Sequence, residues 1–126
     1  MSALPPDDRD YFESRGIRFD VIDGQGQRGV VLCEWSLGNE GFDVEYADVL
    51  IVLPAGYPDI APDMFHTDPW IKLKGAGRFP TRAEHPFDFG GRRWQRWSRH
   101  NREWRPGIDG IWTMVRRVER ALQEAA

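Results

Sequence analysis

The chain begins with the pattern of a short helix and continues with alternating apolar and polar residues. The sequence predicts a helix over Pro6–Arg15, because proline suits the first turn of a helix and Gly16 suits the left-handed position just past its end. Ile17, Phe19 and Val21 then alternate with polar residues, which predicts a half-buried strand. The first helix is therefore expected to lead directly into a sheet.

Two more strands are predicted before the middle of the chain. The second strand is expected to place four side chains on one face: Val31, Cys33, Trp35 and Leu37. The third strand is expected to start near Phe42 and to continue through the apolar run 49–53. Short glycine-containing turns separate the three strands, so the sequence predicts an antiparallel meander.

The regular pattern ends at Pro54. Prolines at positions 54, 58, 62 and 69 exclude a long helix or a central strand from this region, and a short strand is predicted around Met64–His66. Residues 75–105 show neither helical nor strand periodicity and are expected to form a long irregular loop of the kind that carries function. Because Trp94, Trp97 and Trp104 lie in this segment, we expect it to pack against the rest of the protein.

A helix is predicted to close the chain. Asp109 is expected to be its N-cap, and four apolar residues recur at helical spacing: Ile111, Val115, Val118 and Leu122. The sequence thus predicts one α+β domain over residues 1–126. It consists of an N-terminal helix, an antiparallel meander, a long irregular loop of the active-site type and a C-terminal helix packed on the sheet.

Composition narrows the class of protein. With 126 residues, 40% of them hydrophobic, the chain can bury one sizeable core. Its single cysteine cannot form an internal disulfide, so a reducing, cytoplasmic environment is expected. One cysteine and three scattered histidines give no metal-ligand spacing, and we expect no metal or other cofactor. No apolar segment approaches the about 20 residues of a membrane span and no signal peptide is evident, so no membrane partner is expected.

Charge is distributed unevenly along the chain. Residues 1–71 carry four basic and fourteen acidic side chains, whereas residues 72–105 carry ten basic and three acidic ones. The two zones either pair with each other or present separate surfaces to partners. Residues 92–99 mix arginine with tryptophan, as proteins that bind nucleic acids do. A net charge of −3 argues against that function, and arginines stacked on packed tryptophan rings explain the same pattern, so no nucleic-acid partner is expected.

Three short motifs follow one another along the chain: Tyr57-Pro58, His85-Pro86 and Trp104-Arg105-Pro106. Ubiquitin-conjugating enzymes carry similar motifs in the same order. Residues 53–65, with Tyr57-Pro58 at their centre, resemble the proline-rich loop after the third strand of that family. His85-Pro86 stands where the family has its His-Pro-Asn motif. Trp104-Arg105-Pro106 matches the family's Trp-x-Pro motif just before the closing helix.

The chain therefore resembles the ubiquitin-conjugating enzymes, and residues 94–109 are most similar to the prokaryotic family E of these proteins. The resemblance implies the ubiquitin-conjugating fold and a role in a bacterial ubiquitin-like modification pathway. It also implies the partners of such a pathway, which are a ubiquitin-like protein, an adenylating activating enzyme and a deconjugating peptidase.

The chain departs from the family at the reactive residue. The family carries its acyl group as a thioester on a cysteine about ten residues beyond the histidine of His-Pro-Asn. Here that region is residues 94–96, which contain no cysteine, and Phe87 replaces the asparagine of the motif. Cys33 lies in the middle of a predicted strand, where cysteine is usually a small, inert hydrophobic residue, so we expect it to be structural.

Ser98 is the only hydroxyl residue between His85 and Trp104, and His100 follows two residues later. Ser98 is therefore the candidate acyl carrier and His100 the candidate general base, since a serine needs a base to remove its proton. The alternative is that Ser98 is an ordinary loop hydroxyl and His100 a packed or solvated imidazole. His85 is the third candidate catalytic residue, with the ordering of the loop as its alternative role, and His66 is expected to be structural.

Two functions remain open from the sequence. The first is an acyltransferase of the ubiquitin-conjugating type that carries a ubiquitin-like protein on a nucleophile other than cysteine. The second is a catalytically inactive adaptor that binds the ubiquitin-like protein or its activating enzyme.

Overall fold

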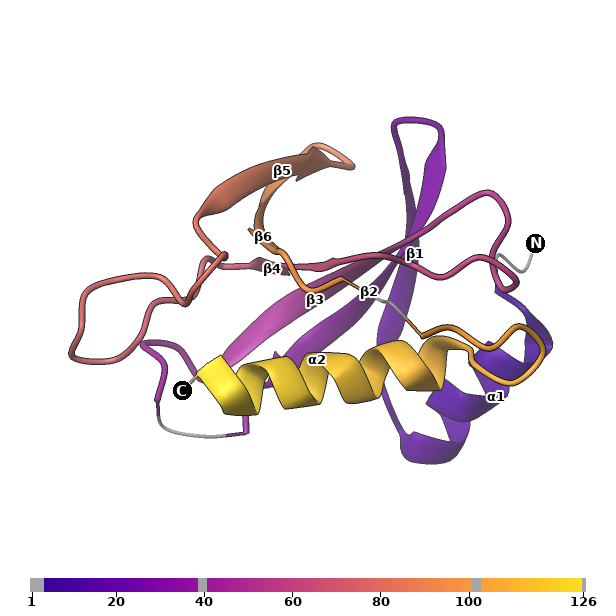
Figure 1. Ribbon diagram of the computed structural model, residues 1–126, viewed down its shortest axis with the longest axis horizontal. Helices are drawn as coiled ribbons and strands as arrows, with labels where there is room; N and C mark the ends of the chain where they lie inside the picture. Colours follow the sequence, from indigo (N-terminus) through magenta and orange to yellow (C-terminus); the bar gives the residue numbers. More distant parts are fainter. Residues whose placement is uncertain (1–3, 39–40, 101–102, 126) are drawn as a thin grey trace.

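The protein consists of a curled antiparallel sheet with a helix near each end of the chain (Figure 1). The computed structural model describes residues 4–38, 41–100 and 103–125. The helices are α1 (Pro6–Arg15) and α2 (Ile111–Ala125). The strands are β1 (Phe19–Gly24), β2 (Gln27–Ser36), β3 (Tyr46–Leu53), β4 (Phe65–Asp68), β5 (His85–Phe89) and β6 (Arg92–Trp97). Within the described residues they form one six-stranded sheet in the order β1-β2-β3-β4-β6-β5, which confirms the predicted α+β class.

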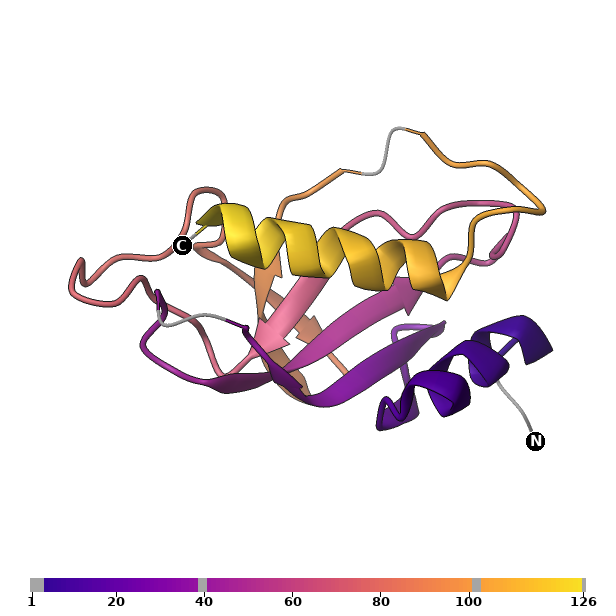
Figure 2. The ribbon, with the colours of Figure 1, turned by 90° about the horizontal axis from the view of Figure 1, so that it is seen from below.

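Both predicted helices form, and the glycine after α1 and the apolar spacing of α2 act as the sequence indicated. Gly16 follows α1 in the left-handed conformation, with φ of 65°, and its N–H bonds back to the carbonyl of Glu13. The apolar residues of α2 are buried, and Figure 2 shows this helix lying across one face of the sheet. The larger core lies between α2 and that face, where Val30, Val49 and Ile51 are completely buried.

The opposite face of the sheet holds a second, smaller core. The sheet curls so that the β5–β6 hairpin comes to lie over β2 and β3, and Val31, Leu50, Phe89 and Trp94 pack in the space between them. The approach is close at Gly29, where a Cβ atom would lie 2.8 Å from Cε1 of Phe89 and 2.7 Å from Cδ1 of Leu50. Glycine is therefore required at this position by packing rather than by backbone conformation.

A bulge in β2 overturns one prediction from the sequence. Leu32 pairs with Val49 and Trp35 with Ala47, so β2 contains one residue more than β3 between these pairs. The bulge includes Glu34, whose φ is 50°. Because the extra residue reverses the alternation, Trp35 contacts the core beneath α2, whereas Cys33 contacts the second core. The prediction that Cys33 and Trp35 share a face is wrong.

The long irregular loop predicted over residues 75–105 contains a hairpin that the sequence analysis missed. Strands β5 and β6 pair antiparallel and are joined by Gly90 and Gly91, with φ of 58° and 80°. Two consecutive glycines with positive φ form the tight turn that suits a two-residue hairpin, so the Gly-Gly pair was the available signal. The third strand was also placed too early, since β3 begins at Tyr46 and Phe42 instead forms an isolated bridge with Leu73.

Candidate functional site

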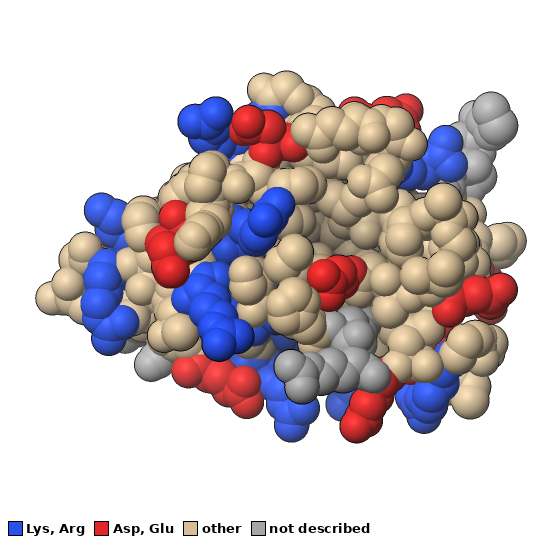
Figure 3. Space-filling view, turned by 45° about the horizontal axis from the view of Figure 1, so that its top comes forward, with Lys and Arg blue, Asp and Glu red and all other residues tan. Residues whose placement is uncertain are grey.

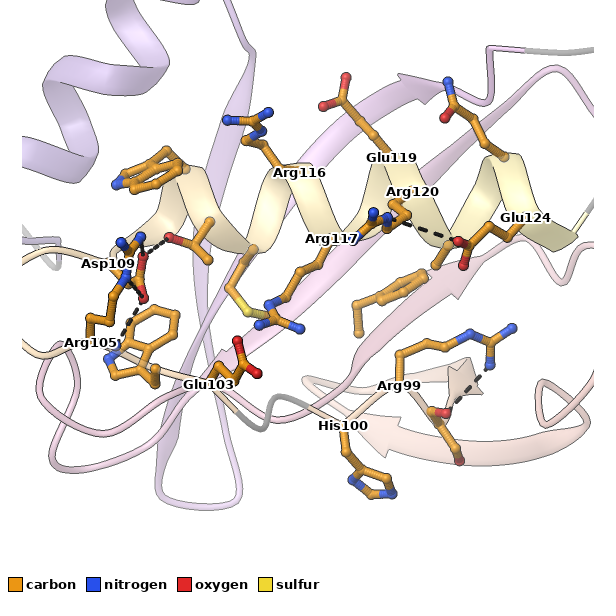
Figure 4. Close-up of a pocket in the computed structure, with 18 of the residues that line it drawn as sticks. Arg99, His100, Glu103, Arg105, Asp109, Arg116, Arg117, Glu119, Arg120 and Glu124 are labelled. Atoms are coloured by element: carbon orange, nitrogen blue, oxygen red, sulfur yellow. Dashed lines mark hydrogen bonds and ion pairs between the residues drawn. The ribbon is translucent and has the colours of Figure 1, made fainter.

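A groove of about 1300 Å³ lies between α2 and two short stretches, residues 98–100 and 103–105, which we call the loop wall (Figure 4). The loop wall directly follows Trp97, whose side chain is held in the core. The buried ring of Trp97 stacks on Phe65 with centroids 5.3 Å apart, and its Nε1–H donates to Oγ1 of Thr67 at 2.9 Å. Immediately after it, the backbone N–H of Ser98 donates to the carbonyl of Arg82 at 3.0 Å.

Ser98 and His100 both line the groove. Nδ1 of His100 lies 3.1 Å and 3.3 Å from the two carboxylate oxygens of Asp63. A carboxylate at Nδ1 favours the tautomer that carries the proton there and leaves Nε2 as an acceptor, as a general base requires. Among the described residues no hydrogen bond joins Oγ of Ser98 to His100, and Figure 4 shows the imidazole pointing away from α2. The contact of Asp63 with His100 could not be predicted from the sequence, because 37 positions separate the two residues.

The Tyr57-Pro58 and Trp104-Arg105-Pro106 motifs contact each other at the other end of the loop wall. Nε1–H of Trp104 donates to the carbonyl of Pro58 at 2.8 Å, and the Trp104 and Tyr57 rings lie 6.4 Å apart. The hydroxyl of Tyr57 donates in turn to the buried carboxylate of Asp8 in α1. Asp8 also accepts the N–H of Ile111, the first residue of α2, at 3.2 Å. The motifs therefore hold together both helices and the loop after β3.

The model of one protein family, described as prokaryotic E2 family E, matches residues 4–125. The chain belongs to this family. The match confirms the resemblance inferred from the motifs, so the chain is a ubiquitin-conjugating-like protein. No curated protein matches the chain, and no solved structure does.

In this family E protein the expected place of the cysteine, residues 94–96, lies inside β6. Trp94 and Gln95 are both fully buried there. Nε2 of Gln95 donates to the carbonyls of Ile71 and Ala83, at 2.9 Å and 2.8 Å. Its Oε1 accepts the N–H of Ile71 at 2.7 Å and the hydroxyl of Thr67 at 2.9 Å. The place of the usual nucleophile is thus part of a hydrogen-bonded core.

The start of α2 differs from the prediction made for Asp109. The N–H of Ile111 bonds to Asp8, so Asp109 is not the residue that caps the helix. Asp109 instead accepts the backbone N–H of Arg105 at 2.8 Å and a guanidinium N–H of the same residue at 2.8 Å. The hydrogen bond from the Arg105 side chain is the main reason that the pKa of Asp109 is lowered to about 2. Asp109 closes the turn that precedes the helix.

The remaining histidines lie away from the groove. His85 is the exposed first residue of β5, pairs with Arg96 and does not line the groove, so the structure brings together only Ser98 and His100 of the three candidates. His66 is buried and stacks on Phe87 with centroids 4.1 Å apart. Burial, and then the charge of Arg96, lower the pKa of His66 to about 3, so this imidazole is neutral near pH 7.

Cys33 has the surroundings of a structural thiol. It is partly buried, and its Sγ lies 3.7 Å from both Oδ2 of Asp20 and the carbonyl of Val31. Burial is the main cause that raises the pKa of the Cys33 thiol, and the nearby carboxylates of Asp20 and Asp48 act in the same direction. A raised pKa leaves little thiolate, the form that reacts.

The two charged zones of the sequence partly pair with each other. Arg92 bonds to Asp48 at 3.0 Å and to Asp68 at 2.8 Å, and its guanidinium lies 4.2 Å from the Trp94 ring centroid. Figure 3 shows basic and acidic side chains interspersed on one face of the molecule. Because the rings of Trp94 and Trp97 are fully buried, neither is available for stacking with nucleic-acid bases.

The described residues contain no group of three or more His, Cys, Asp or Glu side chains that could hold a metal ion. None of the helices described is long and apolar enough to span a membrane.

Proposed function

We propose that this family E protein carries a ubiquitin-like protein as an oxygen ester on Ser98 and passes it to an amine. The proposal depends on one observation, the contact of the Asp63 carboxylate with Nδ1 of His100 beside Ser98 on the loop wall. A base oriented by a third group next to a hydroxyl is the arrangement that activates serine. A hydrogen bond between such a pair is often long in the free protein and tightens when substrate binds.

In the proposed reaction, Oγ of Ser98 attacks the activated C-terminal carbonyl carbon of the ubiquitin-like protein. A C–O bond to Ser98 forms, the bond to the leaving group on the activating enzyme breaks, and Nε2 of His100 takes the hydroxyl proton and passes it to that leaving group. The acceptor amine then attacks the ester and a C–N bond forms. Nε2 of His100 takes a proton from the amine, the C–O bond to Ser98 breaks, and His100 gives that proton to Oγ. Asp63 stays ionised and stabilises the imidazolium that forms in between.

The test is to incubate the protein with its activating enzyme, the ubiquitin-like protein and ATP, and to measure the adduct by mass. An ester should survive thiols and be cleaved by hydroxylamine, whereas a thioester would be lost to both. Ser98→Ala should abolish the adduct and His100→Gln should slow its formation about 100-fold or more. Thr81→Ala, at an exposed hydroxyl near the loop wall, is the matched control and should behave as wild type. An adduct that persists in Ser98→Ala would refute the assignment.

A second function is supported by a different observation. The buried Gln95 fills the expected place of the cysteine, as it would in an inactive adaptor that has kept the docking surfaces of the family. Tight binding of the activating enzyme or the ubiquitin-like protein, with no adduct on any residue, would establish the adaptor and exclude the acyl carrier.

A further inference from the structure

The groove beside α2 is rich in arginine. Six arginines and four acidic residues line it. Two of the arginines are paired, Arg105 with Asp109 at 2.8 Å and Arg120 with Glu124 at 3.9 Å. Among the described residues Arg82, Arg99 and Arg117 form no ion pair, although all three line the groove.

Arg99 and Arg117 are held in a partly desolvated state. Arg99 lies over the buried Trp97 ring, with its guanidinium carbon 5.3 Å from the centroid, and donates to the carbonyl of Thr81 at 3.1 Å. Burial, and then the positive charge of Arg82, lower the pKa of Arg99. On the opposite side of the groove, Nε of Arg117 is buried and has no hydrogen-bond partner among the described residues.

The positions of these groups point to an anionic ligand. Figure 4 shows Arg117 directed from α2 toward the loop wall and Arg99 on the wall itself, whereas Arg116 points away to the other side of the helix. Arginines that share one partly dry groove, one of them with an unsatisfied N–H, favour the binding of carboxylates there. Glu103, also on the loop wall, forms no ion pair with an arginine among the described residues.

The lining of the groove suits a peptide segment rather than a compact ion. The groove has apolar lining from Phe65, Met114 and Ala121 in addition to its arginines. A peptide segment offers both apolar and charged side chains to such a mixed lining, whereas a compact ion offers only charge. The groove also includes Ser98, so a segment bound in it lies near the proposed acyl carrier.

We propose that the groove binds an acidic segment of the protein partner, with carboxylates of that segment on Arg99 and Arg117. This inference deepens the proposed function, on which it rests only for the identity of the partner. It assigns specificity: a partner segment rich in Glu or Asp is accepted and a basic one is rejected.

Binding is measured by fluorescence anisotropy with a labelled peptide that alternates glycine and glutamate, and with a second peptide in which glutamine replaces glutamate. We expect the glutamate peptide to bind at least about tenfold more tightly, with an affinity that falls as salt is added. Arg99→Gln and Arg117→Gln should each weaken its binding about fivefold or more. Arg28→Gln is the matched control, because Arg28 is an exposed arginine outside the groove.

Arg82→Gln supplies a variant with little risk to folding, since this side chain is exposed, and it should weaken binding in the same direction. Equal binding of the two peptides, or unchanged binding in all three groove variants, would overturn the inference. Equally tight binding of single-stranded oligothymidylate would also overturn it, by showing a general affinity for polyanions. Peptide binding is measured without the activating enzyme, the ubiquitin-like protein or ATP, so failure of acyl transfer and failure of peptide binding are separate results.

Discussion

Asp8 is the residue on which the junction of the two helices depends. Its buried carboxylate accepts the Tyr57 hydroxyl and the N–H of Ile111. Asp8→Ala is expected to lower the free energy of unfolding by about 1–3 kcal/mol, because it leaves the buried N–H of Ile111 and the partly buried Tyr57 hydroxyl without this acceptor. Urea denaturation measures this loss. Asp7→Ala, at the exposed neighbouring position, is the control and should change stability little.

Asp8 should also make stability depend on pH in a particular direction. Burial raises its pKa above the ordinary value of 3.8, and the hydrogen bonds from Tyr57 and Ile111 oppose this without cancelling it. The folded protein therefore binds the proton more tightly than the unfolded chain. The resulting stabilisation is present in acid and is lost as pH rises through the raised pKa. The difference in unfolding free energy between wild type and Asp8→Asn should shrink as pH rises from about 3 to 7, and a difference that grows would contradict the account.

Cys33 is expected to be dispensable for function. Its thiol is partly buried and has a raised pKa, so it should react with a thiol reagent much more slowly in native protein than in urea. Cys33→Ala should keep activity and partner binding and lower the free energy of unfolding by about 1 kcal/mol. Rapid labelling of the native protein would contradict the structural role of the thiol, and loss of activity at unchanged stability would show that it takes part in function.

At the scale of single residues, local chemistry could be read from the sequence and long-range pairing could not. The buried α2 residues and the positive φ of Gly16 follow from periodicity and backbone sterics. The contacts of Asp63 with His100 and of Asp8 with Ile111 join residues 37 and 103 positions apart. No local pattern encodes such contacts, so the orienting carboxylate and the helix cap were both found only in the folded chain.

At the scale of elements, the errors have two physical causes. The bulge at Glu34 adds one residue to β2, and alternation read from the sequence assumes that no residue is added. The β5–β6 hairpin was missed because β5 does not alternate simply, although the glycine pair at 90–91 marks its turn. Elements with a regular period were therefore predictable, and elements defined by a turn or an irregularity were not.

The close approach of the β5–β6 hairpin to β2 predicts a specific pairwise effect. A methyl group at Gly29 would overlap Phe89 and Leu50, both fully buried, so Gly29→Ala should lower the free energy of unfolding by about 1–3 kcal/mol. Phe89→Leu removes part of the overlapping ring. In that background, Gly29→Ala should lower the free energy of unfolding by a smaller amount. A double-mutant cycle in urea measures the coupling, and strictly additive effects would show that the hairpin does not press on Gly29.

At the scale of the whole molecule, the acidic zone (residues 1–71) and the basic zone (residues 72–105) do not form two separate surfaces, because some of their side chains pair with each other. Arg92 is paired with Asp48 and Asp68, which belong to the acidic zone. The basic side chains that remain unpaired among the described residues include Arg82, Arg99 and Arg117, which line one groove. The net charge of −3 therefore coexists with a local excess of arginine over acidic residues in this groove.

Nucleic acids are expected to bind weakly, despite the mixture of arginine and tryptophan in residues 92–99. The two tryptophans of this segment are buried, so contacts with phosphate would be the main attraction. Single-stranded and duplex oligonucleotides should bind with a Kd no tighter than about 1 μM near physiological ionic strength. Fluorescence anisotropy across a salt series measures this, and sub-micromolar binding with a steep salt dependence would disprove it.

The hydrogen bonds of the Gln95 side-chain amide limit what a single substitution to cysteine at this position could achieve. All of its hydrogen-bonding positions are used, by Thr67, Ile71 and Ala83. A cysteine introduced here would lie in the interior, out of reach of an incoming protein, and would leave those partners unsatisfied. Gln95→Cys is therefore not expected to give this chain a reactive thiol.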